Sequence, residues 1–256
     1  MKEKIKGYLS EIEQEKNVKI LLACETGSRA WGFPSPDSDY DVRMIYVHPK
    51  DWYLSLSEKK DTIERMVENN DLDITGWDLR KTLRLLWKSN PPLLERIQSP
   101  ILYRYNESFL TTINEHARSC YSRIATLHHY LSMARKCYEE VIRDEAFKLK
   151  KFFYALRTAT VCKWILERDD IPPIAFRKVM DGLTIEPSHA KRISELIVLK
   201  STVGEAYYHR GEEALLQFIK ECIAVAEVNA NHLPPARAEK ENLDTFFRKT
   251  LTASWT

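Results

Sequence analysis

The chain has 256 residues, of which 44% are apolar and 30% are charged, values typical of a soluble globular protein. Its formal net charge of +2 is too small to predict, by itself, a strong non-specific binder of nucleic acids. The sequence contains neither the apolar run of a signal peptide nor about eighteen successive uncharged apolar residues. We therefore expect a cytoplasmic protein with no membrane partner, long enough to form two domains.

The five cysteines are spaced irregularly, and no two of them form a CxxC pair. This spacing does not suit a disulfide framework or a zinc site, so it predicts reduced and mostly buried thiols. The residues are Cys24, Cys120, Cys137, Cys162 and Cys222.

The first hundred residues mix helical and extended patterns. Residues 2–16 carry apolar side chains at helical spacing among charges, which predicts an amphipathic helix. Runs of apolar and β-branched residues predict three strands and a possible edge strand after this helix. In chain order these segments are 18–24, 40–47, the edge strand 61–68, and 71–75.

A strand-to-helix boundary is predicted after residue 75. Gly76 is expected to interrupt the third strand, and Asp78 is placed to cap a helix that runs from Leu79 to about Ser89. Asn90-Pro91-Pro92 ends that helix, and a further short helix ends near Pro100.

Beyond residue 105 the pattern becomes helical, with Pro and Gly between the periodic segments. We therefore predict an α+β protein with a small mixed-sheet domain over 1–105, an all-helical domain over 106–235 and a loosely held tail over 236–256. Phe246, Phe247 and Trp255 could dock that tail on the body. The candidate helices are 107–132, 134–168, 174–180, 188–199 and 211–231.

Two acidic residues and a small turn carry the chemistry. Asp39 and Asp41 are two apart at the start of a predicted strand, so they face the same side and can present oxygens to a hard cation. Gly27 and Ser28 follow the first strand and lead into a short helical turn whose free amides suit phosphate oxygens. Together these residues indicate a nucleotidyl-transfer site.

Transfer of a nucleotide usually needs a third carboxylate. Two divalent ions can lower the pKa of an attacking hydroxyl and neutralise the leaving pyrophosphate, and such ions are commonly bridged by several carboxylates. We choose Asp73, in the third predicted strand, as the third catalytic and metal-binding residue beside Asp39 and Asp41. Asp71, on the same strand face, and Asp78, the expected helix cap, are alternatives.

Three basic residues near these motifs could contact the nucleotide. Arg29 directly follows the phosphate turn. Arg43 shares the strand face of Asp41, where it could reach phosphate or form a salt bridge with the aspartates. Lys81 lies one turn into the helix after Asp78 and could face the triphosphate or simply the solvent.

A stripe in the helical half has a polar N-terminal part and an apolar C-terminal part. Lys150, Tyr154 and Arg157 are followed at helical spacing by Val161 and Trp164. This pattern suits a helix that lines a cleft opposite the carboxylates and binds nucleotide through its first three members. The alternative is a partly buried helix whose bases extend to solvent.

Several motifs resemble a known family. They are Gly27-Ser28-Arg29-Ala30-Trp31-Gly32-Phe33, Ser38-Asp39-Tyr40-Asp41-Val42-Arg43, Asp73-Ile74-Thr75-Gly76-Trp77-Asp78-Leu79-Arg80-Lys81, Ser89-Asn90-Pro91 with Leu94-Glu95, and Lys150-Lys151-Phe152-Phe153-Tyr154-Ala155-Leu156-Arg157. Over residues 18–165 the chain resembles the RlaP predicted nucleotidyltransferases, which are linked to RNA repair and belong to the DNA polymerase β superfamily.

The resemblance implies a polymerase-β-like catalytic domain that uses a nucleoside triphosphate and two Mg²⁺ ions, for which Mn²⁺ could substitute. It also implies that Gly27 and Ser28 contact the triphosphate, that Asp39 and Asp41 bind metal, and, less directly, that Asp73 does so too. The acceptor is left open between an RNA end, a small molecule and a protein side chain. An excess of basic residues over 104–178 leans toward RNA. A regulatory module that binds nucleotide without turnover is the alternative function, and the oligomeric state is not indicated.

Overall fold

The computed structural model describes residues 1–67, 71–234 and 239–255. The chain forms two compact units, and three separate segments build the first: Met1–Gly27, Asp39–Tyr121 and Arg237–Thr256. Ser28–Ser38 and Ser122–Ala236 build the second. This division differs from the expected one in three respects: the first unit continues to Tyr121 rather than ending at 105, residues 28–38 belong with the helical half, and the C-terminal segment belongs with the sheet.

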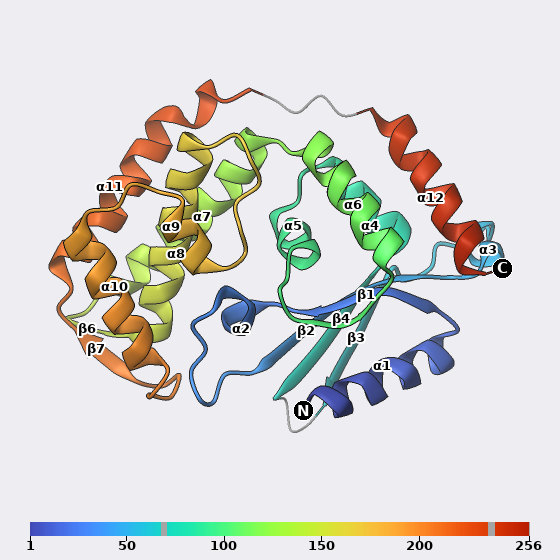
Figure 1. The fold of residues 1–256 in the computed structure, drawn as a ribbon, viewed down its shortest axis with the longest axis horizontal. Coiled ribbons are helices and arrows are strands. Elements are labelled where there is room, and N and C mark those ends of the chain that lie inside the picture. Colours follow the sequence, from blue (N-terminus) through green and yellow to red (C-terminus); the bar gives the residue numbers. More distant parts are fainter. Residues whose placement is uncertain (68–70, 235–238, 256) are drawn as a thin grey trace. The chain divides into compact units, whose positions relative to one another are not determined.

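A five-stranded mixed sheet forms the centre of the first unit, in the order β3-β4-β2-β1-β5 (Figure 1). β2 and β4 are parallel, and the other neighbouring strands are antiparallel. The sheet and the helices confirm the predicted α+β class, although β5 was not predicted and Glu68 of the predicted edge strand lies outside the described residues. The strands are β1 Lys19–Glu25, β2 Tyr40–Val47, β3 Thr62–Val67, β4 Leu72–Asp78 and β5 Leu102–Tyr105.

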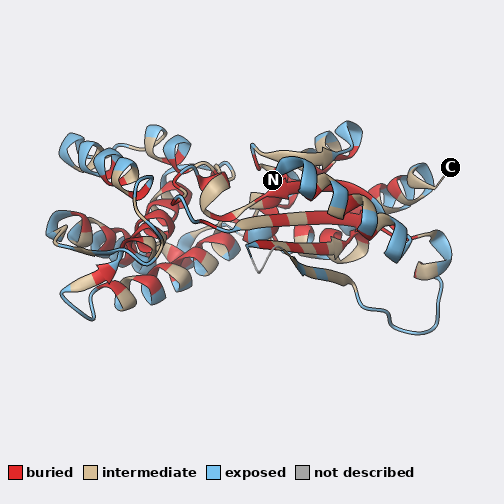
Figure 2. Ribbon diagram, turned by 90° about the horizontal axis from the view of Figure 1, so that it is seen from below, coloured by how far each residue is buried: buried red, intermediate tan, exposed pale blue. Residues whose placement is uncertain are grey.

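Helices cover both faces of this sheet. The predicted first helix is confirmed as α1, Lys2–Lys16, and its buried residues Ile5, Leu9 and Ile12 pack on one face. The other face is covered by α4, α5 and α6 (Figure 1). Figure 2 shows buried residues along the central strands and exposed residues on the outer surfaces of the helices, whereas the edge strands β3 and β5 are only partly buried. The covering helices are α4 Leu79–Trp87, α5 Pro91–Ile97 and α6 Glu107–Cys120.

Gly76 does not interrupt its strand, contrary to the prediction, since β4 continues to Asp78. Its lack of a side chain serves packing instead. A Cβ at this position would lie 2.6 Å from both Cγ and Cε of Met44, which is buried on the neighbouring β2. Glycine therefore allows the Met44 side chain to pack directly against the β4 backbone.

The predicted cap of α4 is confirmed. Asp78 accepts a hydrogen bond from the backbone N–H of Arg80 at 2.8 Å and another from the Tyr53 hydroxyl at 2.5 Å. The carboxylate is 1% exposed, so its two bonds satisfy a group that would otherwise be costly to bury. Tyr53 belongs to the short helix α3, Lys50–Tyr53.

The second unit is mainly helical, but it differs in detail from the prediction. The helix expected over 107–132 divides at residues 121–122, because Ser122 caps a new helix by accepting from Ala125 N at 3.4 Å. The helix expected over 134–168 is also interrupted, by a strand that pairs with a second unpredicted strand. The elements are α7 Arg123–Val141, β6 Ala146–Lys148, α8 Leu149–Glu167, α9 Phe176–Asp181, α10 Pro187–Lys200, β7 Tyr208–Arg210, α11 Glu213–Asn229 and the 3₁₀ turn η2 Ala230–His232.

Aromatic residues explain why 28–38 belongs to the helical unit. This segment includes all but the first residue of α2, Gly27–Trp31. Phe33 is 1% exposed and stacks on Phe153 of α8, with ring centroids 4.9 Å apart. Trp31 makes an edge contact with Tyr154 at 5.0 Å. These contacts bury two large aromatic side chains in the helical core.

The C-terminal segment is ordered differently from the expected loose tail. Lys240–Ser254 forms α12, whose residues Leu243 and Phe246 are buried in the first unit. Phe246 stacks on Phe109 with centroids 5.6 Å apart, and Phe247 contacts the edge of Tyr53 at 5.1 Å. The apolar residues at helical spacing therefore dock this segment, whereas 236–238 and 256 of the predicted tail lie outside the described residues.

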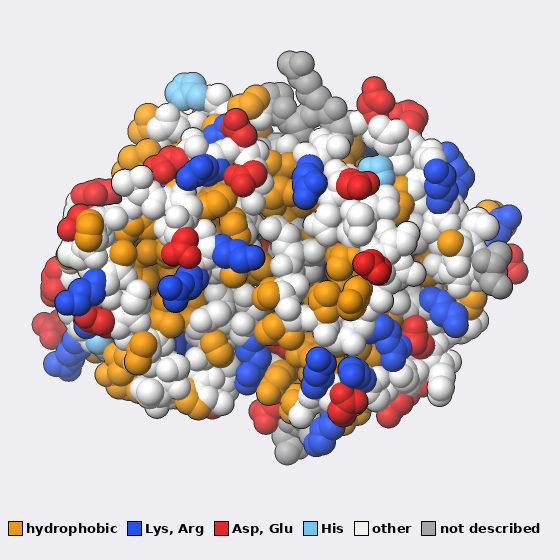
Figure 3. Space-filling view, in the orientation of Figure 1, with side chains coloured by type: hydrophobic (Ala, Val, Ile, Leu, Met, Phe, Trp, Pro, Cys, Tyr) orange, Lys and Arg blue, Asp and Glu red, His pale blue; other side chains and the backbone are white. Residues whose placement is uncertain are grey.

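All five cysteines are free and buried, as predicted. Burial raises the pKa of Cys24 to about 12. No helix in the described part of the chain is long and apolar enough to cross a membrane. Basic and acidic side chains are interspersed over the face seen in Figure 3.

Replacing Gly76 tests its packing role. We expect Gly76→Ala to lower the free energy of unfolding by about 1–3 kcal/mol, because the added methyl overlaps Met44. Gly7→Ala is the matched control. Gly7 is an exposed position of α1 where an added Cβ meets nothing within 4 Å, so this variant should be up to about 1 kcal/mol more stable than the wild type. Urea unfolding measures both, and equal stabilities would contradict the role given to Gly76.

The burial of His48 should make the stability of the fold sensitive to acid. It is 8% exposed and stacked on Trp52, and burial lowers the pKa of His48 to about 4, with Lys59 adding to the effect. The unfolded chain binds a proton near pH 6.5 whereas the folded chain does not, so stability falls by up to about 3 kcal/mol as pH drops from 6.5 to 4. His48→Phe should flatten this part of the unfolding free energy curve. His128→Phe, at an exposed histidine, should leave it unchanged.

Candidate functional site

The parallel pairing of β2 and β4 brings two of the predicted carboxylates together. Asp41 and Asp73 are opposite each other in the register, and their side chains are 35% and 30% exposed. Residues two apart along a strand share a face, so Arg43 and Thr75 lie on the same side of the sheet. The Thr75 hydroxyl donates to Asp73 Oδ1 at 3.0 Å, which fixes one oxygen of that carboxylate.

Arg43 joins the two carboxylates. Its Nη2 lies 2.8 Å from Asp41 Oδ1 and 2.8 Å from Asp73 Oδ2. Its Nη1 donates to the backbone oxygens of Asp73 at 3.1 Å and Val42 at 3.2 Å. Of the two roles predicted for Arg43, this structure contains the salt bridge to the aspartates. The guanidinium offsets the repulsion between two negative charges on adjacent strands.

The other acidic candidates occupy different environments. Asp39 is exposed and directly precedes β2, and Asp71 is exposed directly before β4. Asp78 is buried as the predicted cap of α4, so its alternative role as third carboxylate is not supported. Within 1–67, 71–234 and 239–255, no three His, Cys, Asp or Glu residues form a group that could hold a metal ion. The structure thus assembles Asp41 with Asp73 but not a three-carboxylate cluster.

The pair nevertheless suits a divalent cation. Its donors are hard carboxylate oxygens, which Mg²⁺ prefers, and both carboxylates are partly exposed rather than sealed in the core. A positive group, the guanidinium of Arg43, already lies between them. A cation that bound to Asp41 Oδ1 and Asp73 Oδ2 would have to displace that guanidinium.

Gly27 is required by close approach to Asp41. It has a φ of 64°, a conformation that favours glycine, and an added Cβ would lie 2.2 Å from Asp41 Oδ2. The preceding residue ties the turn to the strand, because Thr26 donates to Asp41 O from its N–H at 2.9 Å and from its hydroxyl at 3.1 Å. The start of α2 is therefore held against one of the two carboxylates.

Glu25 is a supporting residue that the sequence analysis missed. It lies at the end of β1 and is 1% exposed. Its Oε1 accepts from Asp41 N at 2.6 Å, and its Oε2 accepts from the Tyr103 hydroxyl. This buried carboxylate fixes the backbone of Asp41. A charged residue ending an apolar strand beside Thr26-Gly27 was the available signal.

Arg96 is a second cation near the carboxylates, and unlike Arg43 it is buried and was not predicted. It is 5% exposed, and its guanidinium lies 3.2 Å from the ring centroid of Trp77 on β4. Burial, helped by the charge of Arg43, lowers the pKa of Arg96 to about 9, while Asp73 opposes this shift. Arg96 Nη1 has no hydrogen-bond partner in the described residues. Stacking on the indole compensates part of its desolvation.

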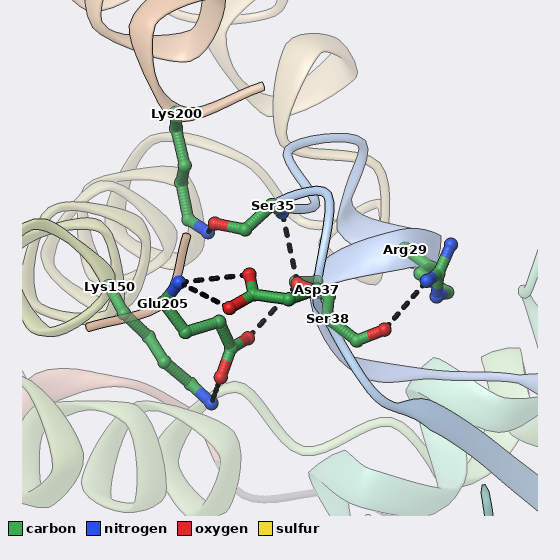
Figure 4. Close-up of polar contacts among 8 residues, drawn as sticks. Arg29, Ser35, Asp37, Ser38, Lys150, Lys200 and Glu205 are labelled. Carbon is green, nitrogen blue, oxygen red and sulfur yellow. Dashed lines mark hydrogen bonds and ion pairs between the residues drawn. The ribbon is translucent and has the colours of Figure 1, made fainter. Parts of the chain in front are cut away.

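Ser28 and Arg29 belong to the second unit, and Figure 4 shows Arg29 bonded to Ser38. Ser28 Oγ donates to Ser38 Oγ at 3.1 Å, and Arg29 Nη2 donates to Ser38 O at 2.6 Å. Ser38 Oγ in turn donates to Glu205 Oε1 at 3.0 Å. The predicted residues Ser28 and Arg29 thus belong to a hydrogen-bond network that includes Glu205, which no sequence pattern marked.

Two lysines extend this network (Figure 4). Lys150 Nζ lies 2.5 Å from Glu205 Oε2, so one predicted nucleotide ligand is ion-paired. Lys200 is 1% exposed and donates to Ser35 Oγ at 2.8 Å, and burial lowers the pKa of Lys200. The backbone N–H of Glu205 donates to Asp37 Oδ1 at 2.9 Å. These bonds fasten the 28–38 loop to the helical elements of its unit.

The other predicted nucleotide ligands, Arg157, Tyr154 and Lys81, contact other protein groups. Arg157 is 2% exposed, with its guanidinium 4.3 Å from the ring centroid of Trp31, which disfavours a phosphate contact. Tyr154 packs on the same indole. Lys81 donates to Asp61 Oδ1 and Thr62 Oγ1, both at 2.8 Å, at the end of β4 opposite Asp73. The expected stripe is thus largely a packing surface.

Comparison with known proteins places the chain in a family. A model of the RlaP family, described as the RNA repair pathway DNA polymerase beta family, matches residues 1–249. The uncharacterized protein YcgL of Bacillus subtilis (strain 168) is 40% identical over 253 residues, covering 98% of this chain and 95% of that protein. A crystal structure of a nucleotidyltransferase-like protein from Exiguobacterium sibiricum 255-15 is 12% identical, with a TM-score of 0.30 over 89% of this chain and 75% of that one. The two sequence matches show that the chain belongs to the RlaP family of DNA polymerase β relatives.

Proposed function

We propose that this protein is a metal-dependent nucleotidyltransferase that moves a nucleoside monophosphate from an NTP to a hydroxyl group, with an RNA end as the favoured acceptor. Family membership supports nucleotidyl transfer in general. The observation that carries the proposal is the pairing of Asp41 with Asp73, which places two partly exposed carboxylates around one cationic group.

Asp41 and Asp73 would hold the divalent ions, two Mg²⁺ or in their place Mn²⁺, with Asp39 as the third proposed ligand. Bound there, such ions would lower the pKa of the attacking hydroxyl and neutralise charge on the phosphates. Glu25 and Thr26 position the Asp41 backbone through the bonds described above. Gly27 allows the turn to approach the carboxylate without a steric clash.

Ser28 and Arg29 are proposed to bind the triphosphate, since they follow Gly27 directly in the chain. Their present hydrogen bonds to Ser38 would be exchanged for bonds to phosphate oxygens. Lys150 is a further proposed phosphate ligand, and its ion pair with Glu205 would have to open first. Arg43, released from the aspartates, is proposed to contact phosphate as well.

The acceptor is the least constrained part of the proposal. The description of the family as part of an RNA repair pathway supports an RNA hydroxyl. A small-molecule or protein acceptor, and a module that binds nucleotide without turnover, are the competing functions. We also propose a cytoplasmic location, which suits five free and buried thiols.

Substitution of single carboxylates tests the site. Asp41→Asn and Asp73→Asn should each reduce transfer of labelled NMP from NTP to RNA by on the order of 100-fold or more, because each removes a charged ligand. Asp71→Asn is the matched control, two residues from Asp73 but exposed, and it should retain activity. The assay combines each of the four α-labelled NTPs with RNA of defined ends.

Activity that survives in Asp41→Asn and Asp73→Asn would overturn the assignment of the two carboxylates. Activity lost in Asp71→Asn but kept in Asp73→Asn would transfer the role of Asp73 to Asp71. If the wild type binds NTP but transfers it to no RNA, small molecule or protein, the non-catalytic module is the better description.

Removal of Arg43 tests whether its guanidinium occupies a cation site. Without divalent ions, Arg43→Ala should be less stable by about 1–3 kcal/mol, because two nearby carboxylates lose their shared partner. Several millimolar Mg²⁺ should then raise its Tm more than that of the wild type, since the cation no longer competes with the guanidinium. Thermal unfolding with and without MgCl₂ measures both effects.

Arg65→Ala is the control for this experiment. Arg65 also bridges two carboxylates, those of Glu11 and Glu15, on the surface of the same unit. Its removal should not increase the response of Tm to Mg²⁺. An equal Mg²⁺ response in Arg43→Ala and Arg65→Ala would count against a cation site at Asp41 and Asp73.

A further inference from the structure

Helix α4 carries an unusual charge pattern. From Leu79 to Leu94 the chain contains four basic residues and no acidic one. Arg80, Arg84 and Lys88 repeat every four residues, so they follow one side of α4 and its C-cap at steps of about 6 Å along the axis. Helix stability accounts for only part of this pattern: Arg84 in the last turn and Lys88 at the C-cap favour the helix dipole, whereas Arg80 near the N-terminus opposes it.

A groove of about 470 Å³ lies beside this basic row, between α4 and α12. Its lining includes the aromatic residues Trp87 and Phe247 and the apolar residues Leu83 and Leu243. Lys240 of α12 adds a further cation. The groove therefore combines an apolar floor with positively charged edges, all within the first unit.

The charges around the groove are poorly balanced. Arg84, Lys88 and Lys240 are exposed, and none of them has an ion-pair partner in the part of the chain that the structure describes. Asp244 is the acidic residue of the lining. By contrast, Lys81 of the same helix is paired with Asp61. Three unpaired cations beside one carboxylate make this surface suited to a polyanion.

An aromatic ring lies beside these charges. Trp87 is 38% exposed although it is a large apolar residue, and Lys240 Nζ lies 3.9 Å from its ring centroid. Arg80 also lines the groove, and its guanidinium lies 5.9 Å from the Phe247 centroid and 4.8 Å from that of Tyr53. Cations alternating with an exposed indole are the combination by which proteins hold a phosphate backbone and stack its bases.

We propose that the groove between α4 and α12 binds a segment of single-stranded RNA. Arg84 and Lys88 contact phosphates, Lys240 exchanges its contact with the Trp87 ring for a further phosphate, and an unpaired base stacks on Trp87 in its place. An acidic protein segment would satisfy the charges but would make no specific use of the indole. Double-stranded RNA offers no exposed base faces for that ring.

The place of the groove defines which part of the RNA it holds. α4 begins directly after β4, at the end opposite Asp73, and five residues of strand separate Asp73 from Asp78 by roughly 16 Å. A strand bound here is therefore held several nucleotides away from an end at Asp41 and Asp73. That this strand is the acceptor rests on the proposed function, whereas binding to the groove does not.

Charge reversal tests the binding. Arg84→Glu with Lys88→Glu should weaken binding of a fluorescein-labelled single-stranded RNA dodecamer at least 10-fold in an anisotropy titration. It should also reduce the dependence of log K on log salt by at least about 1.4, since two phosphate contacts are lost. The matched control is Lys191→Glu with Lys220→Glu, the same charge change at exposed positions of the second unit, which should change the affinity less than twofold.

Variants of the indole separate stacking from charge. Trp87→Ala should weaken RNA binding roughly 5- to 100-fold without altering the salt dependence, and Trp87→Phe should recover most of the affinity. Because Trp87 is partly exposed, both variants should keep the circular dichroism spectrum of the wild type. Thermal stabilisation by Mg²⁺ and NTP should be unchanged in all groove variants. A loss of RNA binding with NTP binding intact therefore concerns the groove and not the carboxylate site.

Three outcomes would overturn the inference. The first is an equal loss of affinity in the groove and control double variants, which would mean that only net charge matters. The second is an unchanged affinity in Trp87→Ala. The third is displacement of the dodecamer by poly-glutamate or by a matched RNA duplex as effectively as by unlabelled single strand, which would assign the surface to an acidic protein or to double-stranded RNA.

Discussion

The parallel pairing of β2 with β4 is the constraint on which the candidate site depends. It sets Asp41 opposite Asp73, and two negative charges at facing positions of neighbouring strands need a positive partner. Arg43 supplies it from the next position on the same face of the strand. The contacts around the pair serve the same arrangement: Glu25 and Thr26 hold the Asp41 backbone, and Gly27 leaves room for its carboxylate. At this site the Arg43 guanidinium offsets the charges of Asp41 and Asp73, and a bound metal cation could do the same.

Strand and helix positions in the first unit followed from local patterns, because each element has an apolar face whose period is visible in the sequence. α1 and β2 were predicted with their observed bounds. Gly76 was misjudged because a glycine in a strand can mark either a break or a close contact, and only the neighbouring Met44 decides between them. The long helices of the second unit were over-extended because residues 121–122 and 142–148 interrupt the helices without Pro or Gly.

The chemistry-bearing residues were predictable to the extent that they lie close in sequence. Asp41 and Arg43 are two residues apart, whereas their link to Asp73 depends on strand pairing. Glu25, Arg96 and Glu205 carry no motif, and their burial or partners appear only once distant segments pack. Arg157 was predicted to bind nucleotide because it lies on a helical stripe with Lys150 and Tyr154, but its guanidinium is buried against Trp31. A basic residue type does not reveal whether its charge meets a ligand or an indole.

The same distinction applies to charge over the whole chain. The basic excess over 104–178 suggested a surface for RNA, yet several of the basic residues there are ion-paired within the protein: Lys150 with Glu205, Lys151 with Glu140 and Lys163 with Glu167. The shorter run on α4 contributes fewer charges, but Arg84, Lys88 and Lys240 have no such partners in the described residues. A polyanion responds to cations that are unpaired and exposed, and not to the number of Lys and Arg in a segment. A net charge of +2 is therefore compatible with a local surface that binds a strand of phosphates.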